Sequence, residues 1–220
     1  MHTRWTAPLI GGGGDERGAE KVGEPGRTGR PDWLFGTGAT PAQKGLAHAV
    51  AAAGCAVLAV YGRDEGWSWW QWVLGLLLVW DLAGGVVANG LDTAKRFYHS
   101  PPPPGTGAAG RFLHRPVGFT AAHVQPLAAG LAFDGGPWWW GPLWYLWALA
   151  GSVLVARVRE PLRRPVALGA VALGAMIAPL VTAPGGMAWL PVVLLLKLVL
   201  AHGVPEGAAA AAGPGGRPPR

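Results

Sequence analysis

The sequence predicts an all-α fold, a polytopic bundle of about six transmembrane helices, and three observations support this. Half of the 220 residues are hydrophobic and only 14% are charged, against roughly a quarter in an ordinary soluble domain. The charges are clustered, which leaves long stretches free of them, as a chain surrounded by lipid requires. Several of the thirteen Trp residues are grouped near segment ends, as at 138–140, where indole rings lie at the level of lipid headgroups.

Six apolar segments follow one another, each about as long as a helix must be to cross a hydrocarbon core of about 30 Å. We place them at 45–62, 68–91, 117–134, 138–156, 165–182 and 186–203. The alternation of polar and apolar residues that is typical of transmembrane strands is absent.

Capping signals mark several of the expected helix ends. Thr40 and Gln43 form the pattern of a capping box before the first segment, and Ser68 and Gln71 repeat it at the second. Pro165 is expected in the first turn of the fifth helix. Gly203 is expected to end the sixth.

The two ends of the chain differ in composition from its middle. Residues 1–44 and 208–220 are rich in Gly and Pro and carry too few apolar residues to form a core, so we expect disordered tails. Residues 45–207 then form the six-helix domain.

Basic residues predict the orientation. Lys95, Arg96, Arg111 and Arg115 lie between the second and third segments, and four Arg residues lie in 157–164. By the positive-inside rule these two loops and both termini face the cytoplasm, which predicts a multi-pass protein of the cytoplasmic membrane. The bilayer is then its main partner, with anionic lipid headgroups at the basic loops, and no nucleic-acid partner is expected.

The segment WDLAGGVVANGLDTAKRFYH, at 80–99, places polar residues at the end of a strongly apolar run. On one continuous helix, Asp81, Gly85, Asp92 and His99 share a face, with Asn89 and Arg96 beside it. Small residues admit a neighbouring helix, and an intramembrane Asp must face protein rather than lipid. We therefore expect this face to point into the bundle.

Depths estimated from the rise of about 1.5 Å per residue bring three ionisable side chains to one level of the membrane. These are Asp81, His123 and Lys197, which lie on three different segments. We predict that Asp81 is paired with Lys197, with His123, or with both.

Two interpretations of this polar cluster remain open. In the first, the cluster is a membrane-embedded active site for chemistry on a lipid, with Asp81, His123 and His202 as catalytic groups and Asn89, Arg96 and Lys197 binding the substrate. His99 and His114 are then candidate ligands of a divalent metal, although their spacing matches no ligand motif.

In the second interpretation the protein is not an enzyme. Asp81 and Lys197 then form an ion pair that fixes helix register in a membrane scaffold, or they belong to a small transporter or proton relay. Haem bound between His48, His123 and His202 is disfavoured, because axial ligation needs two histidines that face one cavity. The substrate, if there is one, is not predicted.

Overall fold

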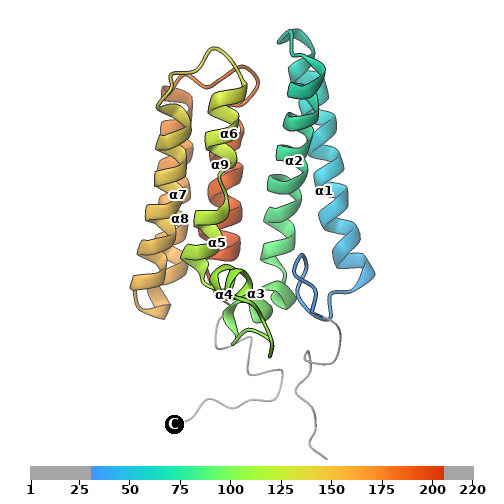
Figure 1. The fold of residues 1–220 in the computed structure, drawn as a ribbon. Coiled ribbons are helices and arrows are strands. Elements are labelled where there is room, and N and C mark those ends of the chain that lie inside the picture. Colours follow the sequence, from blue (N-terminus) through green and yellow to red (C-terminus); the bar gives the residue numbers. More distant parts are fainter. Residues whose placement is uncertain (1–30, 206–220) are drawn as a thin grey trace, which may run out of the picture.

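The computed structural model describes residues 31–205, and every regular element in that range is helical. The long helices lie side by side and are joined at their ends in an up-and-down bundle (Figure 1). In chain order the elements are α1 (Pro41–Tyr61), η1 (Gly62–Asp64), α2 (Trp69–Gly90), α3 (Asp92–His99), α4 (Ala108–Leu113), α5 (Pro116–Ala122), α6 (Gln125–Ala132), α7 (Trp140–Arg157), α8 (Glu160–Ile177), η2 (Ala178–Leu180), α9 (Leu190–Leu195) and η3 (Leu196–His202).

Three of the helices are long and apolar enough to cross a membrane: Pro41–Asp64, Trp69–Gly90 and Glu160–Leu180. They correspond to the first, second and fifth predicted segments. The all-helical class is thus confirmed, together with three of the expected candidate spans.

The other three segments are helical but take different forms. The third is broken at His123 and Val124 into α5 and α6, because these two residues leave helical geometry with ψ angles of 79° and 9°. The fourth is the 18-residue helix α7. The sixth is a shorter apolar helix, Leu190–His202, of which the last seven residues form the π-helix η3.

The predicted capping boxes at Thr40 and Ser68 are both present, and Gly203 caps η3 as expected. The position of Pro165 was wrong: α8 begins at Glu160, so Pro161 lies in its first turn and Pro165 lies inside the helix. Since Pro165 is still close to the start of α8, its missing N–H removes one hydrogen bond near the helix end rather than in the middle.

Figure 1 shows α1 and α2 as one antiparallel pair, α7 and α8 as another, and α5, α6 and α9 between them. The core between these layers is apolar and well buried; it includes Leu82, Trp140, Trp144, Leu190 and Leu194.

The three connections α1–α2, α6–α7 and α8–α9 gather at one end of the bundle. The N–H of Gly185 donates a hydrogen bond of 2.8 Å to the carbonyl of Asp134. Trp67 packs against Phe133, with 4.9 Å between ring centroids, and also lies against Gly186. Helices α3 and α4 lie at the opposite end, which we call the α3 end (Figure 1).

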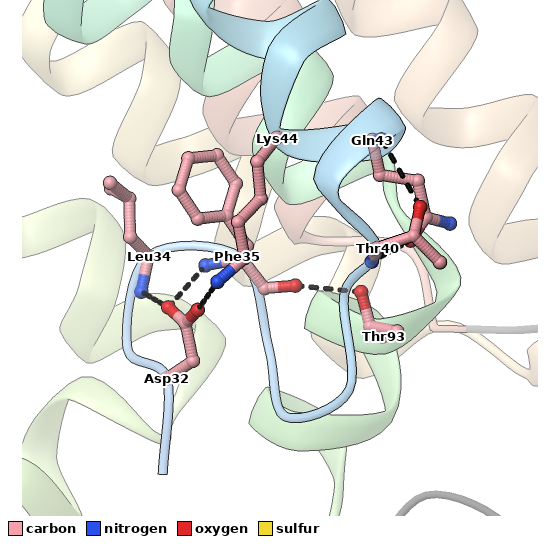
Figure 2. A network of polar contacts seen from close by, with 7 residues as sticks. All are labelled: Asp32, Leu34, Phe35, Thr40, Gln43, Lys44 and Thr93. Carbon is pink, nitrogen blue, oxygen red and sulfur yellow. Dashed lines mark hydrogen bonds and ion pairs between the residues drawn. The ribbon is translucent and has the colours of Figure 1, made fainter. Parts of the chain in front are cut away.

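Residues 31–44, which we had expected in the tail, are folded onto the α3 end. Figure 2 shows Asp32 accepting hydrogen bonds from the N–H groups of Leu34 and Phe35 and pairing with Lys44 at 2.7 Å. Thr93 Oγ1 donates a 2.7 Å bond to the carbonyl of Phe35, which is itself buried. The two predicted tails otherwise lie outside the described residues, apart from this stretch.

The second span does not continue as one helix to His99, as we had expected. Leu91 has a ψ of 139°, so α2 ends at Gly90 and α3 begins at Asp92 in a new direction. The predicted common face of Asp81, Asp92 and His99 was therefore wrong. Helix α3 ends at His99, before the Pro-rich run 101–104.

Candidate functional site

Asp81 on α2 and Lys197 on η3 form an ion pair inside the helical segments. Lys197 Nζ donates to Asp81 Oδ1 at 2.7 Å, and Gln125 Nε2 donates to Asp81 Oδ2 at 2.9 Å. The carboxylate thus joins α2 to η3 and to the start of α6. The predicted pairing of Asp81 with Lys197 is confirmed.

The two partners are buried to very different degrees. The side chain of Lys197 is 4% exposed and that of Asp81 is 44% exposed. An ammonium group that has lost its water depends on its counter-ion, and for Lys197 that counter-ion is Asp81.

The Gly84–Gly85 pair makes this arrangement possible by leaving room on two sides of α2. A Cβ on Gly84 would lie 3.0 Å from the Cβ of Ala51 on α1. A Cβ on Gly85 would lie 2.5 Å from Cε of Lys197, so no larger residue fits without moving the lysine. One glycine admits a helix, as expected, and the other admits the Lys197 side chain.

His123 does not bind Asp81 directly. It lies at the break between α5 and α6, where its Nδ1 donates to the carbonyl of Phe119 at 2.7 Å. The hydroxyl of Tyr145 on α7 donates to the carbonyl of Ala121 at 2.9 Å. Carbonyls near the helix break are thus hydrogen-bonded by side chains, which is what a broken helix inside a membrane requires.

His202 lies at the end of η3, and its ring is stacked on Phe119 with 3.7 Å between centroids and an angle of 14°. Phe119 also contacts the ring of His123, so it separates the two histidines. His202 is 3% exposed, and its Nε2 has no hydrogen-bond partner among the described residues.

Helix α3 closes the end of η3 through two side chains. Lys95 Nζ donates to the carbonyls of Ala201 and Val204, at 2.9 and 2.5 Å. His99 Nε2 donates to the carbonyl of His202 at 2.8 Å. The carbonyls that end a helix lack intrahelical partners, so these bonds satisfy groups that would otherwise be unpaired.

The surroundings of His99 favour its neutral form. Burial lowers the pKa of His99, and the nearby charges of Lys95 and Arg163 lower it further, while the bond to His202 opposes this change.

His114 lies in an aromatic enclosure formed by Trp33, Phe97 and Tyr98, with ring centroids 4.9–5.4 Å away. Burial lowers the pKa of His114 as well. Tyr98 donates from its hydroxyl to the carbonyl of Trp33 at 2.5 Å. Burial, with the negative charge of Asp32, raises the pKa of Tyr98 to about 12.

The remaining candidate residues are not gathered around Asp81. Asn89 is buried near the end of α2, and its Nδ2 has no hydrogen-bond partner in the described range. Arg96 is exposed on α3. Binding of a substrate by Asn89 and Arg96 stays a prediction.

Within residues 31–205, no group of three or more His, Cys, Asp or Glu side chains is arranged to hold a metal ion. His99 already uses Nε2 in its bond to His202, and the ring of His114 is enclosed by aromatic side chains. His48 lies apart from the cluster, against Phe35 and Trp80.

A pocket of about 480 Å³ opens at the α3 end, between α3, α8 and η3. Its charged lining consists of Asp92, Lys95, Glu160, Arg163 and Arg164. Its apolar wall includes Leu168, Leu200 and Val204. Among ion pairs between described residues, none involves Asp92, Glu160 or Arg164.

Sequence reasoning identified Arg163 and Arg164 as loop residues but missed the pocket. Its lining comes from three segments that are far apart in the chain, and it depends on the change of direction at Leu91. Gln125 was missed as a partner of Asp81, although its place beside Pro126 was a usable signal of a helix break.

Comparisons with known protein families, with curated proteins and with solved structures give no match for this chain.

Proposed function

We propose that this chain is a multi-pass membrane protein with six spans that binds the headgroup of a membrane lipid at its α3 end. The broken pair α5–α6, the helix α7 and the continuous α9–η3 then cross the membrane beside the three long apolar helices. The gathering of the three connections α1–α2, α6–α7 and α8–α9 at one end supports this count, because six crossings place these loops on one side.

The positive-inside rule gives the orientation of the protein in the membrane under this proposal. Lys95, Arg96, Arg111 and Arg115 lie on or near α3 and α4, and the four Arg residues of 157–164 lie around the start of α8. The α3 end then faces the cytoplasm, in the cytoplasmic membrane.

The observation that carries the lipid-binding proposal is the pocket at this end. Arg163 and Arg164 line it beside an apolar wall, and guanidinium groups are well suited to binding phosphate. A volume of about 480 Å³ is within the range of small-molecule sites. Basic groups above apolar side chains match the two parts of a phospholipid.

In this proposal the Asp81–Lys197 pair fixes the bundle and does no chemistry. The polar side chains around the pair each form a hydrogen bond to another residue of the chain, as expected of groups that hold helices in place. They are Gln125, His123, Lys95 and His99. On the other side of the pair the core is apolar, which does not favour a polar path through the protein.

The test is phospholipid binding by the full chain purified in detergent, followed by native mass spectrometry during titration with phospholipid. The double variant Arg163→Gln/Arg164→Gln should weaken binding about tenfold, because it removes charge-assisted hydrogen bonds. Arg157→Gln, which changes a nearby arginine outside the pocket lining, is the matched control and should bind as the unchanged protein does. Equal binding by all three would contradict the proposal.

A second candidate function is the lipid-directed enzyme, with Asp81, His123 and His202 as its catalytic groups. The observation in its favour is the buried Nε2 of His202, which has no hydrogen-bond partner among the described residues. A His202→Phe variant keeps the stacking on Phe119. Turnover of a radiolabelled phospholipid by the unchanged protein, lost in this variant, would favour the enzyme over the binding protein.

A further inference from the structure

We propose that the pocket at the α3 end selects a lipid headgroup that carries both a phosphate and a primary ammonium group, as a phosphoethanolamine headgroup does. This inference rests on the proposed lipid-binding function and adds the class of headgroup. It is carried by the charges of both signs that line the pocket.

Two carboxylates and three cationic groups share this one pocket. Asp92 comes from the start of α3 and Glu160 from the start of α8, and both side chains are exposed. A purely anionic headgroup would bring its negative charge close to these carboxylates, which disfavours binding. A headgroup with its own ammonium group provides them with a partner.

The cationic side of the pocket is formed by Arg163 and Arg164 on the first turns of α8. Within residues 31–205, Arg163 makes one long hydrogen bond of 3.4 Å, from Nε to the carbonyl of Val158. Lys95 has a different task, because its ammonium group is held by the carbonyls of Ala201 and Val204. Lys95 therefore joins α3 to η3 and shapes the pocket, and the two arginines bind the phosphate.

The type of ammonium group matters for the carboxylates. A primary ammonium donates up to three hydrogen bonds and can bind Asp92 and Glu160 together. A quaternary choline nitrogen has no N–H to donate. The pocket should therefore prefer phosphoethanolamine headgroups to both phosphoglycerol and phosphocholine headgroups.

The apolar wall argues that the ligand is a lipid rather than a soluble aminophosphate. Leu168 and Leu200 lie on the parts of α8 and η3 that lead into the bundle, and Val204 completes this side. The glycerol and the first carbons of an acyl chain would contact these side chains while the phosphate remains at the arginines.

The experiment compares three phospholipids that differ only in the headgroup: phosphatidylethanolamine, phosphatidylglycerol and phosphatidylcholine. Each is titrated against the full chain in detergent, and bound lipid is counted by native mass spectrometry. We expect phosphatidylethanolamine to bind about tenfold more tightly than the other two, as one additional charge-assisted hydrogen-bonded group implies. Water-soluble phosphoethanolamine is the fourth ligand, and it should bind much more weakly.

Variants of the two carboxylates test binding of the ammonium group separately from binding of the phosphate. Glu160→Gln and Asp92→Asn should remove the preference for phosphatidylethanolamine and leave phosphatidylglycerol binding equal or stronger. Asp134→Asn, an acidic residue at the opposite end of the bundle, is the control and should keep the preference. Thermal unfolding of each variant in the same detergent shows that it is folded.

The possible failures are distinct. Equal binding of phosphatidylethanolamine and phosphatidylglycerol by the unchanged protein would overturn this inference and leave lipid binding intact. No binding of any phospholipid above the level of the arginine double variant would overturn the proposed function with it. Tight binding of soluble phosphoethanolamine would overturn the lipid part.

Discussion

At the scale of single residues, Asp81 and Lys197 show how unequal burial divides one ion pair into two different roles. Lys197 is almost completely enclosed, and Gly85 leaves it only enough room to pass across α2. Asp81 is half exposed and has Gln125 as a second partner. The lysine is thus the group whose charge requires compensation, and the aspartate provides it.

This asymmetry predicts unequal costs for the two single replacements. Asp81→Leu leaves a buried ammonium group unpaired and should destabilise the protein by about 3–5 kcal/mol, the typical cost of breaking a buried pair from one side. Lys197→Met should cost less, because the carboxylate that remains keeps its hydrogen bond from Gln125. The double variant should recover most of the loss, since both charges are gone. Chemical unfolding in detergent micelles measures all four proteins.

The control for this double-mutant cycle is Arg63→Met/Asp64→Leu. It removes an ion pair in which both side chains are exposed, so it should change the free energy of unfolding little. If Lys197→Met proved as costly as Asp81→Leu, the assignment of roles would be wrong. If the double variant were less stable than either single one, the pair would contribute more than charge compensation.

At the scale of elements, the sequence predicted most helices but not the places where they change direction. Capping boxes at Thr40 and Ser68 are local patterns of four residues, so they could be recognised directly. The extended residue at Leu91 has no such pattern: Gly90 and Asp92 disfavour a helix interior, but Leu91 between them gives α3 no side-chain cap. The depth estimate brought Asp81 and Lys197 together, although Lys197 lies in the π-helix η3 and not in a regular α-helix.

The π-helix η3 is a further element that local patterns did not indicate. Two side chains of α3, Lys95 and His99, donate hydrogen bonds to the carbonyls at its end. These contacts cross more than 100 positions of sequence. The candidate site was thus predicted where residues share a depth, and missed where long-range contacts shape the backbone.

The contact between α3 and η3 predicts a dependence of stability on pH. The pKa of His99 is lowered from 6.5 in the folded protein by burial and by the charges of Lys95 and Arg163. Above pH 6.5 the imidazole is neutral in both the folded and the unfolded protein, so its hydrogen bond contributes fully. As the pH falls below 6.5 only the unfolded protein gains the proton, and stability should fall by at most about 1.4 kcal/mol per pH unit.

The comparison that isolates His99 is His99→Gln, because a Gln side-chain amide can donate to the same carbonyl without titrating. Thermal unfolding between pH 8 and pH 5 should show a smaller loss of stability in this variant than in the unchanged protein. His114 also has a lowered pKa and acts in the same direction, so part of the loss should persist. A variant with the full pH dependence of the unchanged protein would contradict this account of His99.

At the scale of the whole molecule, six crossings and three crossings place the loops on different sides of the membrane. The connections α1–α2, α6–α7 and α8–α9 touch one another at one end, while α3 and α4 lie at the other (Figure 1). If all six segments cross, these three loops share one side of the membrane. If only the three long apolar helices cross, α5–α7 remain on the side of α3, and the α6–α7 loop lies there with them.

Single cysteines distinguish these arrangements, because Cys55 is the only natural cysteine and Cys55→Ser removes it. In that background we place one cysteine at a time at Asp64, Asp134, Thr182 or Ser100 and treat intact cells with a membrane-impermeant maleimide. Six crossings predict that the first three positions are labelled and that Ser100 is labelled only after the cells are opened. Asp134 is decisive: protection of this position together with Ser100, while Asp64 reacts, would establish that α5–α7 do not cross and would overturn the six-span proposal.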